Sequence, residues 1–311
     1  MSLEALRPLL ESPDPEIRRV ALLQAADFAP EDPAPFVTAC RDPDPSVRLE
    51  AARALEGEAA PQAVAALLDR LEDEAPEVRA VAAGSLAELR DETAAPLLLH
   101  RLSVAGPAAR APILAALRKL RPPGALAPAI AALADPLPSV RREAVGVLAY
   151  LRDPAALPAL AGQATADPDP EVRRAAVGGL SFASDHRALP ALVAALADSD
   201  WQVREEAAVT LGKLAPPGAA DALIAALADG YWQVRLKAAG ALGRLRERRA
   251  VPALAETLRH PVCNLRKEAA SALGAIGDAA ARPALSAALT DPDVEVRKLA
   301  VRALAALEPD S

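Results

Sequence analysis

The sequence predicts an all-α protein built from about ten helical hairpins with a period of 31 residues. Three observations lead to this fold class: the choice of apolar residues, the regular return of one arginine, and a helix-start motif before that arginine. Apolar residues make up 52% of the 311-residue chain but aromatic residues only 2%, so the core must be built from alanine, leucine and valine. A composition dominated by such small residues suits closely packed helices better than strands.

An arginine that follows an apolar residue recurs at intervals of 30 to 32 residues. The third residue after it is alanine in nine of the ten repeats, with Ile113 as the exception, and the seventh is leucine in nine, with Ala25 as the exception. These offsets lie on one stripe of a helix, so each repeat should contain a helix with one buried face. The ten arginines are Arg18, Arg48, Arg79, Arg110, Arg141, Arg173, Arg204, Arg235, Arg266 and Arg297.

The residues before the arginine form a helix start. In D-P-D-P-S-V-R and D-P-D-P-E-V-R, Asp44 and Asp169 are expected as N-caps and the prolines after them as the first helical residues. Another helix precedes each turn, as in PQAVAALLDRLED, and its prolines, such as Pro158 and Pro252, fall in or near the first turn, where a missing N–H costs little. We call these the first and second helices of repeats one to ten.

Repeat four departs from the pattern. Its sequence GPAARAPILAALRKLRPPG lacks the acidic cap and has Pro112 two residues after Arg110, so its second helix is expected to start late or to kink. Residues 1–104 hold 10 basic and 20 acidic side chains, whereas residues 105–134 hold four basic and no acidic ones. We therefore expect one domain over residues 1–311 with an irregular joint at 103–125.

The pattern D-x-D-x-x-V-R-x-x-A-x-x-x-L, joined to A-V-P-A-L or A-L-P-A-L, resembles HEAT repeats over all ten units. It is most similar to the short bacterial HEAT-like type first associated with phycobilisome lyases. The resemblance implies a right-handed α-solenoid whose second helices form a continuous concave surface. It does not specify function, because HEAT-like arrays serve as scaffolds, chromophore lyases, DNA-repair proteins and a hydroxylase. A lyase role would need a pigment-protein partner, which the sequence does not indicate.

The chain has two tryptophans, Trp201 and Trp232, and each stands three residues before its arginine, where repeats one to six have proline. They are therefore expected as partly exposed residues at the start of a second helix. Either each ring covers the neighbouring turn, or the two form an aromatic ridge with Tyr231 that anchors a partner. A platform for stacking nucleobases is less favoured, because such sites combine aromatic residues with a basic groove.

The second-helix face of repeats five to eight carries mixed charges and two aromatic residues, which suits a protein partner better than a phosphate backbone. The candidate partner-binding residues are Trp201, Tyr231, Trp232, Tyr150, Phe182, Arg142, Arg174, Lys213 and Arg244. The repeated arginines have an aspartate six or four residues earlier in most repeats and are expected to be structural. They would form an Asp–Arg ladder that includes Arg48, Arg79, Arg141, Arg173, Arg204, Arg235, Arg266 and Arg297.

No catalytic chemistry or cofactor is predicted. His100, His186 and His260 lie in three different repeats, and none is followed by glutamate, unlike the paired His-Glu motifs of deoxyhypusine hydroxylase, a HEAT-like iron enzyme. Metal ligands must converge within a few ångströms, which histidines spread over separate repeats do not. Phosphate-binding glycine loops and nucleophile elbows are missing as well. Glycines such as Gly212, Gly243 and Gly274 lie at equivalent helix positions and are explained by close helix packing.

Charge and termini restrict the partners further. The net charge of −7 argues against general binding to polyanions, and acidic neighbours dilute the arginines that a DNA-repair type of HEAT-like protein would use. No signal peptide or membrane-spanning run is predicted, and Cys40 and Cys263 are too few for a disulfide scaffold. We expect a cytoplasmic, monomeric and non-catalytic scaffold for protein–protein interaction. A nucleic-acid-associated protein that uses the arginines of repeats five to eight is the alternative.

Overall fold

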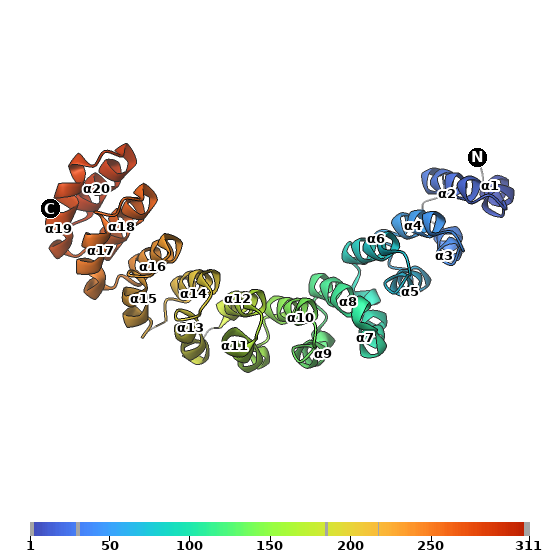
Figure 1. Cartoon of the computed structure of the whole chain (residues 1–311), viewed down its shortest axis with the longest axis horizontal. Coiled ribbons are helices and arrows are strands. Elements are labelled where there is room, and N and C mark those ends of the chain that lie inside the picture. Colours follow the sequence, from blue (N-terminus) through green and yellow to red (C-terminus); the bar gives the residue numbers. More distant parts are fainter. Residues whose placement is uncertain (1–2, 29–31, 184–185, 217, 308–311) are drawn as a thin grey trace. The chain divides into compact units, whose positions relative to one another are not determined.

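The computed structural model describes residues 3–28, 32–183, 186–216 and 218–307. These residues form helices and turns, and none of them belongs to a strand. Two compact bodies make up the chain, Met1–Asp153 and Pro154–Ser311. Each body is a stack of helical hairpins in chain order (Figure 1), as the sequence predicts.

The N-terminal body contains the first ten α-helices, which pair into five hairpins. Their bounds are α1 Leu3–Leu10, α2 Pro15–Phe28, α3 Ala34–Ala39, α4 Pro45–Ala54, α5 Pro61–Arg70, α6 Pro76–Ala87, α7 Ala95–Val104, α8 Pro107–Leu120, α9 Leu126–Ala132 and α10 Pro138–Leu151. Short 3₁₀ helices precede α7 and α9, namely η1 Glu92–Ala94 and η2 Pro123–Ala125.

The C-terminal body contains the remaining ten α-helices in five hairpins. Their bounds are α11 Leu157–Ala166, α12 Pro170–Gly179, α13 Leu189–Ala195, α14 Trp201–Leu214, α15 Ala220–Ala226, α16 Trp232–Leu245, α17 Val251–Thr257, α18 Cys263–Ile276, α19 Arg282–Ala287 and α20 Val294–Ala306. The 3₁₀ helices of this body are η3 Pro154–Ala156, η4 Leu180–Phe182, η5 His186–Ala188, η6 Arg248–Ala250, η7 Ala279–Ala281 and η8 Ala288–Thr290.

The helix starts follow the predicted capping chemistry. Asp44 and Asp169 are N-caps, and their carboxylates accept hydrogen bonds from the amides of Ser46 and Glu171, each at 2.8 Å. Asp200 and Asp293 cap α14 and α20 in the same way. A carboxylate at this position satisfies amides that have no partner within the helix and also favours the positive end of the helix dipole. The second helices therefore begin three residues before the repeated arginine.

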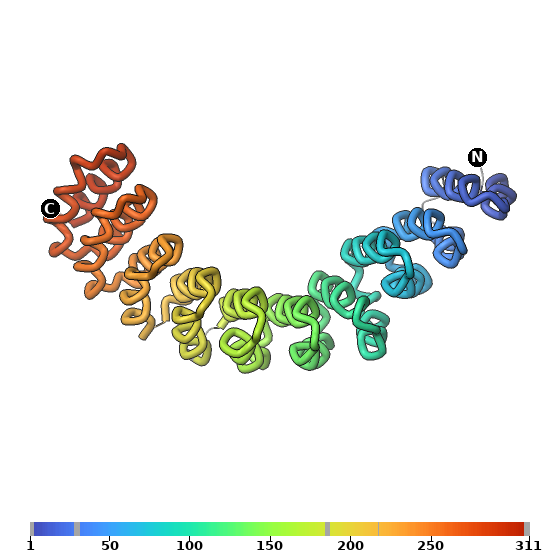
Figure 2. The backbone as a smooth tube through the Cα atoms, in the orientation of Figure 1, coloured from blue at the N-terminus to red at the C-terminus, as the bar shows by residue number. Residues whose placement is uncertain are grey.

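The second helices pack against one another in sequence, α12 on α14, α14 on α16, α16 on α18 and α18 on α20 in the C-terminal body (Figure 2). Alanine and glycine allow this close approach. A Cβ on Gly243 would lie 2.9 Å from the Cα of Ala272, and one on Gly274 would lie 2.9 Å from the Cβ of Ala303. Both distances are shorter than van der Waals contact. The prediction that these glycines serve helix packing is confirmed.

Repeat four differs from the sequence-based expectation in one respect. Helix α8 starts at Pro107, three residues before Arg110 as in the other repeats, and continues to Leu120 with Pro112 inside it. The expectation was that this helix starts late or kinks. It does not start late, because a proline at the first helical position lacks only an N–H that has no helical acceptor there, so the missing acidic cap does not delay the start. A kink at Pro112 stays a prediction. The residues of the expected joint, 103–125, lie inside the N-terminal body.

Candidate functional site

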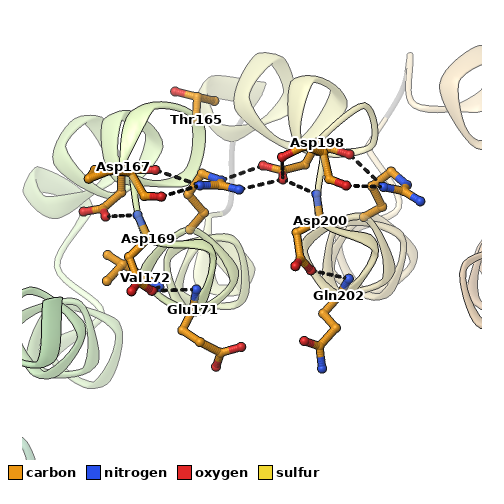
Figure 3. Close-up of polar contacts among 12 residues, drawn as sticks. Thr165, Asp167, Asp169, Glu171, Val172, Asp198, Asp200 and Gln202 are labelled. Atoms are coloured by element: carbon orange, nitrogen blue, oxygen red, sulfur yellow. Dashed lines mark hydrogen bonds and ion pairs between the residues drawn. The ribbon is translucent and has the colours of Figure 1, made fainter.

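The repeated arginines form a ladder along the turns of the hairpins. In repeat six, Arg173 donates through Nη1 to the carbonyl oxygens of Asp167 and Pro168, at 2.9 and 3.3 Å. Its Nε and Nη2 donate to the two carboxylate oxygens of Asp198, at 2.7 and 2.8 Å (Figure 3). One guanidinium thus closes its own turn and binds the aspartate of the next repeat through a two-point fork, the strongest arrangement for this pair.

We call each such pair a rung of the ladder. The described rungs join an arginine to an aspartate 24 or 25 residues later: Arg18/Asp42, Arg48/Asp73, Arg110/Asp135, Arg173/Asp198, Arg204/Asp229 and Arg266/Asp291. The aspartate six residues before an arginine serves two arginines. Asp198, for example, supplies its backbone carbonyl to Arg204, while its carboxylate binds Arg173 of the preceding repeat.

The other predicted ladder arginines close their own turns. Arg79, Arg141 and Arg297 each donate Nη1 to the two carbonyls five and six residues earlier, and Arg235 donates Nε to the carbonyl of Asp229. Within the described ranges, neither Arg79 nor Arg235 has a carboxylate partner. The residues 25 positions after them are Val104 and His260 instead of aspartate.

The side chains of the rungs are partly or fully buried. In the Arg48/Asp73 rung the two side chains are 6% and 1% exposed, compared with 14% and 11% in the Arg204/Asp229 rung. Burial works to raise the pKa of Asp73, but hydrogen bonds from Arg48 and from the Ala75 amide outweigh it, and the pKa lies below the ordinary value of 3.8. The same balance lowers the pKa of Asp198 and Asp229. Asp73, Asp198 and Asp229 are therefore ionised at neutral pH.

The aromatic residues of repeats seven and eight lie beside one of these rungs. Trp201 and Tyr231 stack with ring centroids 5.4 Å apart and planes 10° from parallel. The guanidinium carbon of Arg204 lies 5.6 Å from the centroid of the Tyr231 ring, within the range of a cation–π contact. Trp201 is the first residue of α14, and Tyr231 is the N-cap of α16. The Trp201 ring thus covers the turn of the next repeat. This is the first of the two interpretations given above, in which each ring covers a neighbouring turn.

Trp232, the first residue of α16, is 37% exposed and Tyr231 is 48% exposed. Trp201, which is half-buried, and Trp232, which is exposed, both begin a second helix, as the sequence predicts. We call Trp201, Tyr231 and Trp232 the aromatic edge.

The remaining candidate residues do not gather into one cluster. Tyr150, 51% exposed, belongs to the N-terminal body and lies beneath the guanidinium groups of Arg118 and Arg121, at 5.9 and 5.1 Å from its centroid. Phe182 is half-buried in η4 of the C-terminal body, and Arg142 in the N-terminal body is exposed.

The cationic candidates of the C-terminal body are largely engaged by neighbours. Arg174 binds Glu171 one turn earlier on α12, at 2.6 Å. Arg244 donates Nε to the carbonyl of Gly212 at 3.0 Å and thereby ties α16 to α14. Lys213 is exposed in the last turn of α14. This face therefore offers few uncompensated positive charges.

The comparisons with known proteins agree with this architecture. HEAT repeats match residues 33–118, 105–181, 161–235 and 220–305, which together span most of the sequence. The chain belongs to the HEAT-repeat family. No curated protein matches the sequence.

Solved structures with the same arrangement have low sequence identity and show the fold alone. An engineered protein is 24% identical with a TM-score of 0.57, and the match covers 100% of both chains. YibA of Escherichia coli is 20% identical with a TM-score of 0.54, over 92% of this chain and 94% of YibA. A chain in the structure of Kap95p with RanGDP is 16% identical with a TM-score of 0.64, over 98% of this chain and 50% of that one. None of these matches concerns phycobilisome lyases, so that narrower resemblance stays a prediction.

The described part of the HEAT-repeat chain shows no assembled metal centre. There, no three histidine, cysteine, aspartate or glutamate side chains gather as metal ligands. His100 is exposed and His260 half-buried, in different bodies, and the side chain of His186 lies outside the described residues. Cys40 and Cys263 are both free thiols, and burial raises the pKa of the Cys40 thiol to about 12. None of the described helices has the length and apolar character needed to cross a membrane.

Sequence reasoning missed the importance of His260. The position six residues before the repeated arginine is aspartate in seven of the ten repeats, from Asp42 to Asp291, and His260 stands at this position in repeat nine. Ser12 and Val104 are the other exceptions. Comparison of the repeats at this position would have revealed the change. What the sequence could not reveal is that the affected partner is Arg235 of the preceding repeat.

Proposed function

We propose that this HEAT-repeat protein is a non-catalytic scaffold that binds another protein through its second-helix face and inter-repeat turns. The observation that carries the proposal is the aromatic edge. Trp201 and Tyr231 are stacked and Tyr231 and Trp232 are exposed, in a chain with three phenylalanines, two tyrosines and two tryptophans. Rigid aromatic groups at a surface supply a large contact area with little loss of side-chain entropy.

The charges around this edge support a protein partner over a nucleic acid. Arg173 and Arg204 bind aspartates, Arg174 binds Glu171, and Arg249 binds Glu247 and Asp221. A phosphate backbone needs several basic side chains without such compensation. By contrast, mixed charge around an apolar centre is typical of protein interfaces. The structure of Kap95p bound to RanGDP contains a chain of similar fold. It supports the proposal only in general terms, as an example of such a fold in a complex between proteins.

Affinity capture from a lysate of the source organism, with and without nuclease, tests this function. The test variant combines Trp201→Pro and Trp232→Pro, which restores the residue found at this position in repeats one to six. Val294→Pro is the matched control, because Val294 is also the first residue of a second helix and is 49% exposed, but is not aromatic.

We expect that the wild type and the Val294→Pro variant both capture a protein when nuclease is present. The double variant should not capture this protein. Capture that disappears with nuclease would instead favour the nucleic-acid alternative. Equal capture by all three proteins would show that the tryptophans serve only the turns, and would contradict the proposed role of the aromatic edge.

A further inference from the structure

Arg235 in the C-terminal body lacks the ladder aspartate that Arg204 and Arg266, in the repeats before and after it, both have. Arg235 donates Nε to the carbonyl of Asp229 in its own turn. In repeats seven and nine the corresponding arginines, Arg204 and Arg266, also bind Asp229 and Asp291 through Nε and Nη2. The residue 25 positions after Arg235 is His260. No carboxylate in the described part of the chain pairs with the Arg235 guanidinium.

His260 preserves the backbone turn while removing the carboxylate. Its Nδ1 accepts a hydrogen bond from the amide of Val262 at 3.1 Å, as Asp198 does from the amide of Asp200 at 2.8 Å. Its carbonyl oxygen accepts from Arg266 Nη1 at 2.9 Å. Because Nδ1 is the acceptor, the neutral ring carries its proton on Nε2 and is a second donor. Burial and the charges of Arg235 and Arg266 lower the pKa of His260 below 6.5, which keeps the ring neutral at neutral pH.

A pocket of about 480 Å³ lies at this place, between the first helices of repeats eight and nine. Its apolar wall comes mainly from Ile224 and Leu227 on α15 and from Leu265 on α18, and Arg235 and His260 supply the donors. Glu256 and Arg259 also line it but bind each other at 2.8 Å. Among the charged side chains that line the pocket, Arg235 therefore has no ion pair with a carboxylate of the described residues, although its charge also helps to lower the pKa of Asp229, which is bound to Arg204.

Pockets of similar size in the N-terminal body contain complete rungs. One of about 560 Å³ is lined by Arg18 and Asp42, and one of about 540 Å³ by Arg110 and Asp135, and in both the pair is formed. The pocket at Arg235 has the same kind of apolar wall and the same arginine but lacks the anion. The chain itself thus shows which chemical group fits against such an arginine.

We propose that this pocket, which we call the open rung, binds an aspartate or glutamate side chain of an acidic segment in a partner protein. The Nε of Arg235 donates to the Asp229 carbonyl, so the partner's carboxylate meets the terminal guanidinium nitrogens, as Asp135 meets Nη1 of Arg110, whose Nε also donates to a backbone carbonyl. These nitrogens and the second donor on His260 match the two oxygens of a carboxylate, and the pocket volume is in the ordinary range for a bound segment. The inference rests on the proposed function only in that the carboxylate comes from a protein.

The open rung and the aromatic edge lie on one helix. Trp232 is the first residue of α16 and Arg235 the fourth, so their side chains project from the same side of its first turn. A segment with an acidic side chain in the open rung can therefore extend toward an aromatic anchor. The two sites are still separable, because different side chains carry them.

A peptide with the sequence of residues 288–294, Ala-Leu-Thr-Asp-Pro-Asp-Val, is a suitable probe, since it contains the aspartate that binds Arg266 within the chain. We would titrate it, with blocked ends, into the full-length protein and follow the backbone amide signals by NMR. We expect saturable shifts centred on α16 and on residues 256–261, with a dissociation constant on the order of 1 mM or tighter. A peptide with asparagine in place of both aspartates should bind at least about tenfold more weakly.

Two substitutions remove the site in different ways. Arg235→Gln removes the guanidinium, and His260→Asp leaves Arg235 intact but supplies the missing carboxylate from within the chain. Both should weaken peptide binding at least about tenfold. Val104→Asp, the equivalent change opposite Arg79, is the matched control and should leave binding unchanged. Because His260→Asp restores a rung, it is expected to fold even if Arg235→Gln does not.

The proposal is overturned if the peptide causes no shifts at millimolar concentration, if the asparagine peptide binds equally well, or if His260→Asp binds like the wild type. It is also overturned if free acetate at the same concentration causes the same shifts, since the pocket would then not recognise a protein segment. The Trp201→Pro, Trp232→Pro variant should still bind the peptide. Failure of the open rung and failure of the aromatic edge are therefore distinguished by separate measurements.

Discussion

Repeats seven and eight contain the same arginine in the same turn, yet the two arginines have different surroundings. Arg204 binds Asp229 through two hydrogen bonds of 2.7 and 3.1 Å, whereas Arg235 faces His260 and a pocket. Both arginines also donate to a backbone carbonyl six residues earlier. The change of one residue in the following repeat thus separates a completed ion pair from an available cation.

The repeated arginine therefore has one of two roles, depending on whether the next repeat supplies an aspartate. Where the aspartate is present, the arginine joins neighbouring hairpins, and its charge is neutralised. Where a neutral residue that preserves the turn replaces the aspartate, as His260 does opposite Arg235, the arginine still binds the carbonyl of its own turn, but through Nε instead of Nη1, and it forms no ion pair with a described residue of the next repeat. A repeat protein can in this way create a charged site without changing its backbone.

Acid should produce the largest effect, because it removes all aspartate rungs together. The pKa values of Asp73, Asp198, Asp229 and Asp291 are lower in the folded chain than the ordinary 3.8. Their contribution to the free energy of unfolding is therefore complete above 3.8 and is lost as pH falls through 3.8 toward the folded values. Urea unfolding at a series of pH values would measure this loss. An unfolding free energy that stays constant below the ordinary aspartate pKa would contradict the role of the rungs.

The buried rung should be more sensitive to substitution than the exposed ones. Asp73→Ala leaves the buried Arg48 without its main partner and should lower the free energy of unfolding by about 3–5 kcal/mol. Asp229→Ala, in a rung that is more exposed to water, should cost about 1–3 kcal/mol. Urea unfolding of the two variants at neutral pH makes the comparison. Glu11→Ala, which removes an exposed pair with Arg7, is the control and should cost at most about 0.5 kcal/mol. Equal losses for Asp73→Ala and Asp229→Ala would show that burial does not set the strength of a rung.

Completion of the open rung should stabilise the chain moderately. His260→Asp places a carboxylate opposite Arg235 and should raise the free energy of unfolding by about 1 kcal/mol at neutral pH. The gain should disappear in acid, since the new aspartate then becomes protonated, and unfolding curves at neutral and acidic pH would show both effects. Val104→Asp tests the same idea opposite Arg79. A destabilised His260→Asp variant would mean that Arg235 is not positioned to accept a carboxylate.

The smallest effect is expected where the second helices end. Ala215 and Arg246, which end α14 and α16, have φ angles of 45° and 52°, whereas the equivalent residue of α18 is Gly277 with φ of 69°. A left-handed conformation costs a residue with a Cβ about 1–2 kcal/mol, and part of this is offset by the greater freedom of glycine in the unfolded chain. Ala215→Gly should therefore raise the free energy of unfolding by about 0.5 kcal/mol. The reverse change, Gly277→Ala, should lower it, and thermal unfolding would measure both.

Much of the fold could be predicted because its determinants are local. The N-caps Asp44 and Asp169 and the prolines in the first turns each act within one helical turn. The glycines contact the next second helix, but the sequence shows them because they recur at the same position of successive repeats. The late start expected for α8 was wrong because the absence of one favourable feature, an acidic cap, was given more weight than Pro107 at the first helical position. The placement of Trp201 and Trp232 at helix starts followed from their position three residues before Arg204 and Arg235.

The partners of the side chains could not be predicted in the same way. The sequence predicted an Asp–Arg ladder but not which aspartate each arginine binds. Arg173 has the carbonyls of its own turn on one side and Asp198 of the next hairpin on the other. Which aspartate it reaches depends on how two hairpins stack. The same holds for Trp201 and Tyr231, which are 30 residues apart in the sequence and stack only because successive turns lie side by side.

The sequence by itself determined the period, the helix boundaries and the small-residue packing of this HEAT-repeat protein, since these depend on backbone conformation and on side-chain size within a short segment. Only the tertiary structure decided that arginines such as Arg173 and Arg204 bind forward to an aspartate of the next repeat, and that Arg235, opposite His260, has no such aspartate. The physical reason is that ion pairs and pockets depend on the distance between groups from different hairpins, which is set by the stacking of helices and not by any single repeat.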